Sequence, residues 1–275
     1  MYVIAHNHRV LNEETDLLPV PVRRERMLQL ITDREFVRVS ELAEAFGISD
    51  VTVRADLASL ETSHAVRRVR GGVMPPPRGA RPEPSCEESL VEFAHEKQRI
   101  GEYAASLVHS GMGVLLDVGT TTTAVARALV ARTDLERVTV VTNGLNIALE
   151  LEHAMPRLTV VVTGGTLRRL QHSLVNPLAT VLLEQLHVDI AFVGCNGVDP
   201  DGFTNINLPE AEVKRSIIAA SRRAVVVADG SKLGQTHLGR IARLSDVHTL
   251  VTGPSAPDHE VRRLERAGLD VVRVE

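Results

Sequence analysis

The stretch Ser40–Leu60, SELAEAFGISDVTVRADLASL, predicts two short helices joined by a tight turn. Leu42 and Phe46 have the spacing that places apolar side chains on one face of the first helix. Gly47 is expected to end this helix, because glycine readily adopts the left-handed conformation found there. The Ser49 hydroxyl is expected to cap the second helix. The stretch therefore has the helix-turn-helix pattern.

The second of these helices is expected to present small and polar side chains to solvent. Val51 and Leu57 are predicted to face inward. Thr52, Arg54 and Ala55 are predicted to face outward. Because a helix with such an outer face fits the major groove of DNA, we interpret it as a recognition helix.

A basic segment follows the two helices. Residues 65–74, AVRRVRGGVM, alternate apolar and basic side chains and predict a β-hairpin wing that turns at Gly71-Gly72. An isolated Arg-rich hairpin is usually a solvated surface, but beside a helix-turn-helix its guanidinium groups are placed to pair with phosphates. The predicted DNA contacts are Arg23, Arg24, Ser40, Ser49, Thr52, Arg54, Arg67, Arg68 and Arg70.

The composition requires any nucleic-acid contact to be local, because the 275-residue chain carries a net charge of −4. No apolar run approaches the length of a membrane span, and the N-terminus has no signal-peptide core. Cys86 and Cys195 form no CxxC pattern, which fits a reducing cytoplasm. The eleven histidines show no metal-binding spacing. We therefore expect a cytoplasmic protein without a metal or cofactor.

The chain divides into four segments of different composition. Residues 1–18 show no periodicity and are expected to form a flexible extension, and residues 19–74 form the predicted winged helix-turn-helix domain. Residues 75–85, PPPRGARPEPS, hold five prolines and predict a semi-rigid linker. Residues 86–275 form the predicted effector-binding domain.

The second domain alternates apolar strands with amphipathic helices, beginning with one long helix predicted over 86–110. Strands such as VTVVT at 138–142 and AVVVA at 224–228 are continuous apolar runs, so both of their faces must be buried. This pattern predicts an α/β fold with a mainly parallel sheet and helices on both sides.

The ends of the predicted strands carry polar residues, as expected of a ligand site in such a fold. Asp117 and Gly119 precede four successive threonines at a helix start, which indicates a phosphate cradle. An ordinary helix cap is the alternative, although one threonine would suffice for it. Among only three lysines, Lys214 and Lys232 lie at strand ends or nearby helix starts, where a cation would neutralise a phosphate.

Glu210 and Lys214 are four residues apart on a predicted helix, and that spacing alone indicates only a surface ion pair. Together with the other strand ends, it describes a pocket for a phosphorylated small molecule. The predicted effector contacts are Asp117, Gly119, Thr120, Thr121, Thr122, Asn143, Gly164, Gly165, Glu210, Lys214 and Lys232.

Both halves, in this order, resemble a DeoR-family transcriptional regulator over about residues 20–255. In the first half the matching motifs are Arg23-Arg24, Val39-Ser40-Glu41-Leu42-Ala43, Ser49, Thr52-Val53-Arg54, Asp56-Leu57, Leu60-Glu61 and Arg70-Gly71-Gly72. In the second half they are Glu96-Lys97, Ile100, Asp117, Gly119-Thr120-Thr121, Thr142-Asn143, Gly164-Gly165, Gly202-Phe203-Thr204, Glu210-Ala211, Asp229 and Ser231-Lys232.

The resemblance implies transcriptional control, usually repression, of sugar-catabolic genes. It implies double-stranded operator DNA and a phosphorylated sugar as binding partners, and a homo-oligomer, either a dimer or a tetramer. It also implies a sensor fold similar to the pentose-phosphate isomerases.

That fold similarity supplies a rival hypothesis, a sugar-phosphate isomerase in which Asp117, Glu210 and Lys232 serve as acid–base groups. The isomerases carry an acidic pair after the strand that here ends at Gly194, whereas Cys195-Asn196-Gly197 is uncharged. A catalyst also has no need of an Arg-rich winged helix. A purely architectural DNA-binding protein would leave the polar strand ends unexplained. The sequence therefore predicts a regulator and not an enzyme.

Overall fold

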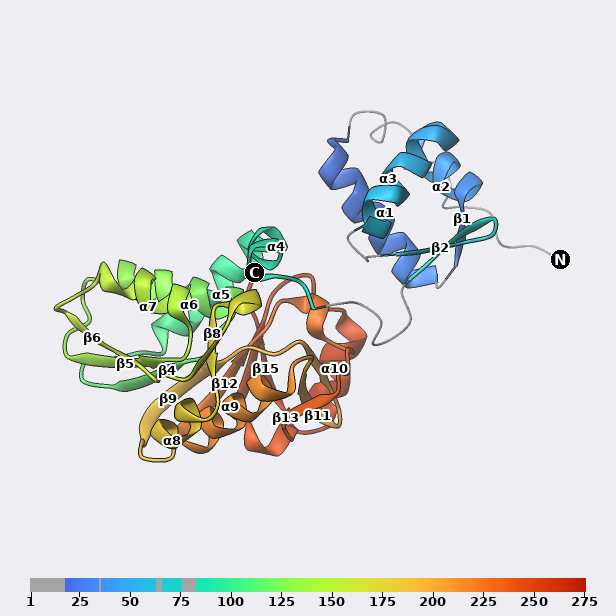
Figure 1. Ribbon diagram of the computed structural model, residues 1–275. Helices are drawn as coiled ribbons and strands as arrows, with labels where there is room; N and C mark the ends of the chain where they lie inside the picture. The colour runs from blue at the N-terminus through green and yellow to red at the C-terminus, as the bar shows by residue number, and fades with distance from the viewer. Residues whose placement is uncertain (1–17, 35, 63–65, 76–82) are drawn as a thin grey trace. The chain divides into compact units, whose positions relative to one another are not determined.

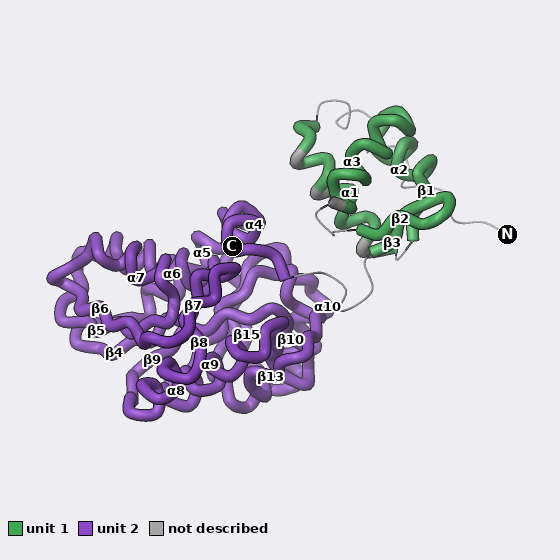
Figure 2. The backbone as a smooth tube through the Cα atoms, in the orientation of Figure 1, with its two compact units in different colours: residues 1–82 green, residues 83–275 purple. Residues whose placement is uncertain are grey.

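The computed structural model describes residues 18–34, 36–62, 66–75 and 83–275 (Figure 1). Its internal contacts divide the chain into two compact units, Met1–Pro82 and Glu83–Glu275 (Figure 2). Nearly all of the predicted N-terminal extension, and most of the predicted proline-rich linker, lie outside the described residues.

In its described residues, the first unit contains three helices and a small antiparallel sheet with strand order β1-β3-β2. Its elements are α1 (Val20–Arg34), β1 (Val37–Arg38), α2 (Val39–Phe46), α3 (Asp50–Thr62), β2 (Arg67–Val69) and β3 (Gly72–Met74). The β2–β3 hairpin is the predicted wing, and α2 and α3 are the two predicted helices of the helix-turn-helix.

The turn between α2 and α3 has the predicted geometry. Gly47 ends α2 with a φ of 62°, in the left-handed region that glycine adopts without strain. The Ser49 hydroxyl accepts a hydrogen bond from the Thr52 N–H at 3.2 Å, which satisfies one of the free donors at the start of α3.

The inward face of α3 differs from the prediction at one residue. Val51 is 77% exposed, whereas Val53 is fully buried. The buried positions Val53, Asp56, Leu57 and Leu60 have the i, i+3, i+4 and i+7 spacing of one face of a helix. Val51 lies on the opposite side of α3, because two residues along an α-helix correspond to a rotation of about 200°, so its apolar side chain belongs to the outer surface.

The most unusual member of this inner face is the carboxylate of Asp56. It accepts hydrogen bonds from Arg23 Nε at 2.7 Å and Arg24 Nε at 2.8 Å, so it joins α3 to α1. Burial raises the pKa of Asp56, but the hydrogen bonds and charges of the two arginines outweigh it and hold the pKa below 3.8.

The second unit is a parallel seven-stranded sheet with helices on both faces. Its helices are α4 (Cys86–Val91), α5 (Ala94–Ser106), α6 (Thr120–Ala131), α7 (Leu145–Glu152), α8 (Leu178–Leu183), α9 (Leu208–Ala219) and α10 (Asp258–Arg266). The strands of the large sheet are β4 (Gly113–Leu116), β5 (Val138–Thr142), β6 (Leu158–Val162), β9 (Val188–Val193), β12 (Ser221–Val227), β14 (Thr249–Thr252) and β15 (Asp270–Arg273).

The sheet has the strand order β15-β14-β12-β9-β4-β5-β6. The chain therefore starts in the middle at β4, runs outward through β5 to β6, and then returns to place β9 on the other side of β4. The strand order reverses between β4 and β9. In open α/β sheets, ligands bind outside the carboxyl ends of the strands at such a switch point.

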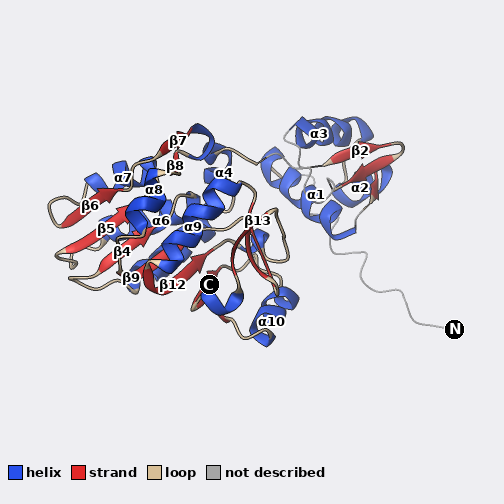
Figure 3. Cartoon of the chain, turned by 60° about the horizontal axis from the view of Figure 1, so that its bottom comes forward, coloured by secondary structure: helices blue, strands red, loops and turns tan. Residues whose placement is uncertain are grey.

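Side chains of the sheet alternate between two hydrophobic cores. Val114 and Leu116 belong to the core formed with α5, α6 and α7, and Leu115 between them belongs to the core formed with α8, α9 and α10. Figures 1 and 3 show these two groups of helices on opposite faces of the sheet. The predicted α/β fold is therefore confirmed. No described helix is long and apolar enough to cross a membrane.

Two features of this unit depart from the sequence prediction. The helix expected over 86–110 is divided into α4 and α5, because Phe93 adopts a left-handed φ of 52° between them. Five short strands were not predicted. They form the β7–β8 hairpin (Thr166–Arg168 and Ser173–Val175) and a sheet of β10 (Gly197–Asp199), β11 (Gly202–Asn205) and β13 (Gly239–Ala242).

We expect Asp56→Asn to weaken the attachment of α1 to α3, because the amide cannot balance two guanidinium charges. Amide hydrogen exchange in α1 and α3 should report a loss of about 1–3 kcal/mol at neutral pH. Since the folded pKa of Asp56 is lowered, its contribution is present above pH 3.8 and is lost as the pH falls through the lowered value. Glu44→Gln, at an exposed carboxylate of α2, is the matched control. Equal protection in both variants would contradict this role.

Candidate functional site

The switch point between β4 and β9 is held together by one carboxylate. Asp117 follows β4, and its Oδ2 accepts a hydrogen bond at 3.0 Å from the N–H of Gly194, which follows β9. Lys214 of α9 donates its Nζ to the same oxygen. Asp117 and Lys214 are both buried, so this ion pair joins two strands and a helix below the surface.

Glu210, one turn before Lys214 on α9, is also buried. Burial alone would lower the pKa of Lys214, but the charges of Asp117 and Glu210 raise it above its ordinary value. Burial raises the pKa of Glu210, but Lys214, the Ser173 hydroxyl and Arg168 together hold it below its ordinary value. Lys214 and Glu210 therefore both keep their charges inside the fold.

The predicted phosphate cradle is the N-terminus of α6. Gly119 precedes the helix with a φ of 139°, which favours glycine. Thr122 and Thr123 are buried, and their hydroxyls donate to the Gly119 carbonyl at 2.9 and 2.7 Å. These two hydroxyl hydrogen bonds therefore stabilise the start of α6. The backbone N–H groups of its first turn have no intrahelical acceptor and provide the positive end of the helix dipole.

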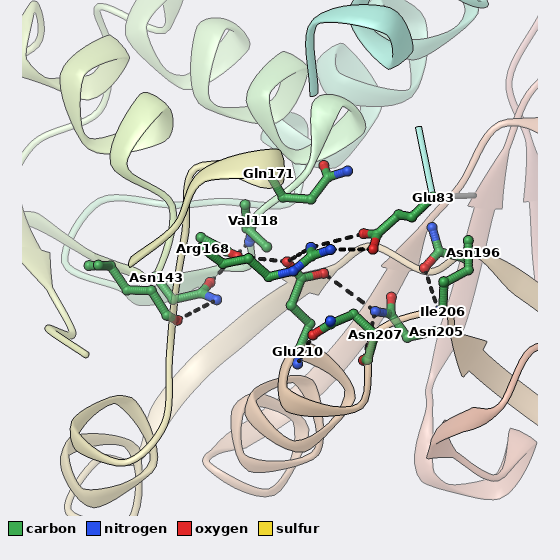
Figure 4. Close-up of polar contacts among 12 residues, drawn as sticks. Glu83, Val118, Asn143, Arg168, Gln171, Asn196, Asn205, Ile206, Asn207 and Glu210 are labelled. Carbon is green, nitrogen blue, oxygen red and sulfur yellow. Dashed lines mark hydrogen bonds and ion pairs between the residues drawn. The ribbon is translucent and has the colours of Figure 1, made fainter. Parts of the chain in front are cut away.

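Asn143, after β5, fixes the approach to this cradle. Its Oδ1 accepts the Val118 N–H at 3.0 Å, and its Nδ2 donates to the Leu174 carbonyl at 3.4 Å. The Leu174 N–H in turn donates to the Asn143 carbonyl at 2.7 Å. The buried Asn143 thus connects the loop before α6 to the β7–β8 hairpin (Figure 4).

The glycine pair after β6 allows the hairpin to lie close to this edge of the sheet. Gly165 has a φ of 125°, and a Cβ added there would lie 2.2 Å from the Val175 carbonyl oxygen. Only glycine permits this approach of the two hairpin strands. The predicted role of Gly164 and Gly165 as effector contacts remains a prediction, and the structure adds this backbone role.

The hairpin brings a cation into the site that the sequence analysis missed. Arg168, at the end of β7, donates from Nη1 to Glu210 Oε1 at 2.8 Å and to Glu83 Oε1 at 3.0 Å. Its Nη2 donates to the other oxygen of Glu83. Ser173 Oγ also donates to Glu210, at 2.6 Å. Figure 4 shows the Arg168 guanidinium between the two carboxylates.

The start of α9 forms the adjoining wall. The Asn207 side chain caps the helix by accepting the Glu210 N–H at 3.1 Å. Asn205 Nδ2 donates to the Asn207 carbonyl at 3.2 Å and to Glu210 Oε2 at 3.4 Å. Asn196 Oδ1 accepts the Ile206 N–H at 2.9 Å. Asn205 and Asn207 thus hold Glu210 in position, whereas Asn196 holds the backbone before α9. None of these three amides was among the predicted effector contacts.

The other two lysines lie near the end of β12, around Asp229. Its Oδ2 lies 3.8 Å from Lys97 Nζ and 3.9 Å from Lys232 Nζ. Lys97 is buried and donates to the carbonyls of Ser89 and Glu92 at the end of α4, whereas Lys232 is 29% exposed. Lys232 is therefore the lysine that is accessible to a ligand.

The predicted effector contacts fall into two groups. The buried group forms a framework around the site, and its members are Asp117, Thr121, Thr122, Asn143, Glu210 and Lys214. The partly exposed group is Gly119, Thr120, Gly164, Gly165 and Lys232. Burial raises the pKa of the neighbouring Cys195 to about 12, so its thiol is protonated. Among the described residues, no three His, Cys, Asp or Glu side chains are grouped to hold a metal ion.

In the first unit, the predicted DNA contacts are also of two kinds. Arg54 on α3 and the wing residues Arg67, Arg68 and Arg70 are exposed, as are Ser40 and Ser49. Arg23 and Arg24 are partly buried and paired with Asp56, and Thr52 is half-buried with its hydroxyl 2.9 Å from that of Ser49. The interpretation of Arg23 and Arg24 as DNA contacts remains a prediction. The structure gives them a packing role as well.

Two family models cover the chain in the order that the motifs suggested. The DeoR-like helix-turn-helix domain matches residues 23–76, and the DeoR C terminal sensor domain matches residues 92–254, more than half of the chain. The chain belongs to the DeoR family. It is thus a DNA-binding transcriptional regulator and not an enzyme, as the sequence predicted.

Curated relatives of this DeoR-family chain are similar along almost their whole length. The uncharacterized HTH-type transcriptional regulator YgbI of Escherichia coli is 34% identical over 256 residues, 93% of this chain and 98% of the relative. A putative aga operon transcriptional repressor of Escherichia coli is 32% identical, over 92% of this chain and 93% of the relative. The glycerol-3-phosphate regulon repressor of Haemophilus influenzae is 30% identical, over 84% and 89%.

Solved structures are more distant from this DeoR-family chain. A probable sor operon regulator from Shigella flexneri aligns with a TM-score of 0.43 and 13% identity, over 62% of this chain and 89% of that chain. A ribose 5-phosphate isomerase from Methanocaldococcus jannaschii aligns with a TM-score of 0.39 and 20% identity, over 51% and 55%. Both scores are below 0.5, and the fold of the second unit is defined by its own strand order.

We expect Lys214→Met to destabilise the second unit strongly, because it leaves the Asp117 carboxylate buried without its cation. Breaking a buried ion pair in this way costs about 3–5 kcal/mol. Replacing both partners, as Asp117→Asn with Lys214→Met, should recover most of that loss in urea unfolding. Arg215→Met, at the next and exposed position of α9, is the matched control. A loss from Lys214→Met no larger than in this control would show that the pair does not hold the switch point.

Proposed function

We propose that this regulator represses a carbohydrate-catabolic operon and that a phosphorylated sugar or related intermediate controls its affinity for the operator. The observation that supports this most directly is the site at the β4–β9 switch point. There, the free N–H groups of α6, the guanidinium of Arg168 and the ammonium of Lys232 offer anion-binding groups beside hydroxyl and amide side chains. This combination is suited to a phosphate ester that also carries hydroxyl groups.

The names of relatives agree with this proposal. One is called a repressor of the aga operon and another a repressor of the glycerol-3-phosphate regulon. We propose for this chain the same type of control, with a phosphate ester of a sugar or polyol as its ligand. The isomerase hypothesis is not favoured, because Asp117 and Glu210 are buried in ion pairs and the chain belongs to a family of regulators.

We further propose that the regulator is a cytoplasmic homo-oligomer, a dimer or tetramer, that presents paired winged helices to repeated half-sites. The exposed face of α3, with Arg54, would enter the major groove, and the arginines of the β2–β3 wing would contact the phosphate backbone. The effector then changes operator affinity by favouring one state of the protein over another, and operator DNA changes effector affinity by the same factor.

The assignment of α3 as the recognition helix is tested by Arg54→Ala. We expect it to weaken binding to DNA from the upstream region of its own gene, because Arg54 is an exposed cation on the helix proposed to enter the groove. Fluorescence anisotropy should show a loss equivalent to about 1–3 kcal/mol if Arg54 contacts a base, or a salt slope lower by about one if it contacts a phosphate. Arg99→Ala, an exposed arginine of α5, is the control. Unchanged affinity and salt slope would remove α3 from the interface.

The ligand site is tested by Lys232→Ala, which removes the accessible lysine. We expect operator binding without ligand to stay as in the wild type, and the response to a panel of sugar phosphates to disappear. Arg222→Ala, an exposed cation near the start of β12, at the opposite edge of the sheet, should keep the response. Equal loss of operator binding and ligand response in Lys232→Ala would be inconsistent with two separate sites.

A further inference from the structure

The Arg168 guanidinium forms an ion pair with the carboxylate of Glu83, the first residue of the second unit. Both oxygens of Glu83 accept hydrogen bonds from the two terminal nitrogens of Arg168. This two-point geometry is the one by which a guanidinium also binds a phosphate. The side chains of Glu83 and Arg168 are 8% and 19% exposed, so the pair is largely removed from water. Glu83 therefore occupies the face of Arg168 that an anionic ligand would require.

The charges around Arg168 do not leave room for a further anion. Glu83 and Glu210 already place two carboxylates on one guanidinium. A phosphate ester, which carries between one and two negative charges at neutral pH, would be repelled unless one carboxylate left. Arg168 therefore cannot pair with a phosphate ester while it is still paired with both Glu83 and Glu210.

Glu83 is the carboxylate that is free to leave. Glu210 is tied down by Ser173, Asn205 and its position on α9. Within the described residues, the side-chain hydrogen bonds of Glu83 all come from Arg168. Burial and the Glu210 charge raise the pKa of Glu83, and Arg168 offsets this only in part, so its carboxylate is held less favourably than that of Glu210.

Glu83 is also the first residue of the second unit. The predicted linker ends at residue 85, and the helix-turn-helix precedes it in the chain. Two more contacts attach this region to the same hairpin. Gln171 Nε2 donates to the Pro84 carbonyl at 2.6 Å, and His172 Nε2 lies 2.8 Å from Glu87 Oε1. The end of the linker is therefore seated on the segment that supplies Arg168.

We propose that Arg168 receives the phosphate group of the effector and that Glu83 occupies its place in the unliganded protein, so that effector binding displaces Glu83 and releases the end of the linker. This inference rests on the proposed function of the site. In this proposal, the Glu83 carboxylate competes with the phosphate of the effector for Arg168. In the same proposal, the release of the linker end is the change through which the effector lowers operator affinity.

The binding arm of the test uses inorganic phosphate, measured by titration calorimetry on the full chain. Glu83→Gln keeps the size of the side chain but removes the competing charge, and we expect phosphate to bind about tenfold more tightly. Arg168→Ala should lose phosphate binding. Arg168→Lys keeps the charge beside Glu210 but not the two-point geometry, and it should bind phosphate more weakly than the wild type while remaining folded in thermal denaturation.

The matched control is Glu87→Gln. It removes the other carboxylate that joins this region to the hairpin, in a pair with His172 that lies outside the Arg168 cluster. We expect wild-type phosphate affinity in this variant. Equal tightening in both glutamine variants would indicate a general charge effect and would overturn the competition, as would wild-type affinity in Glu83→Gln. Failure of both the wild type and Glu83→Gln to bind phosphate at millimolar concentration would overturn the assignment of Arg168.

The regulatory arm measures operator binding without any ligand. Glu83→Gln should bind operator more weakly than the wild type, because it imitates the released linker. Unchanged operator affinity in Glu83→Gln would overturn the release as the signal. If the wild type itself bound no operator, the proposed function would fail instead. The two failures are therefore distinguishable.

Discussion

The arrangement of the second unit depends on the buried ion pair between Asp117 and Lys214. A carboxylate at the end of β4 satisfies the backbone of Gly194 at the end of β9 and holds α9 through its ammonium partner. Because an unpaired charge at this depth would cost several kcal/mol, each partner requires the other. The pair fixes the two strands between which the sheet changes direction. It thereby sets the position of the α6 N-terminus on one side and of Glu210 on the other.

The Asp117–Lys214 pair joins residues that are 97 positions apart in the chain, and contacts of this kind are not visible in a local sequence pattern. The sequence therefore predicted the fold better than the candidate site. A strand such as Val138–Thr142 is mostly apolar and is therefore stable only when it is buried. The strands and the α/β class could thus be predicted from the sequence pattern alone. Local turn chemistry likewise predicted the Gly47 turn and the β2–β3 wing. Val51 was placed wrongly because one valine among small residues does not fix the phase of a helix face. The neighbouring Val53 and Asp56 set that phase, and Asp56 is buried only through pairing with α1.

For the candidate site, the sequence predicted a location at the strand ends but not the contacts that its side chains make. Strand ends drew attention to Asp117 and Asn143, and helix spacing drew attention to Glu210. In the structure, tertiary partners hold these three polar groups in a framework. Whether a side chain faces a ligand or a neighbouring residue depends on contacts distant in sequence. Arg168 was missed for the same reason, since it lies on a hairpin without a strong local pattern. The pair Gly164-Gly165 was the available signal that the chain doubles back there.

The sparse use of lysine has a practical consequence for chemistry on this protein. Two of its three amine side chains are sealed in ion pairs or against carbonyl groups, with 6% of Lys97 and 4% of Lys214 exposed. Lys232 remains as the accessible side-chain amine, at 29%, and it lies at the edge of the sheet where we propose that the effector binds. A reagent that acylates amines would therefore label this edge, besides the α-amino group of the chain, without any cysteine being introduced. The natural chain already provides an attachment point for a reporter of site occupancy.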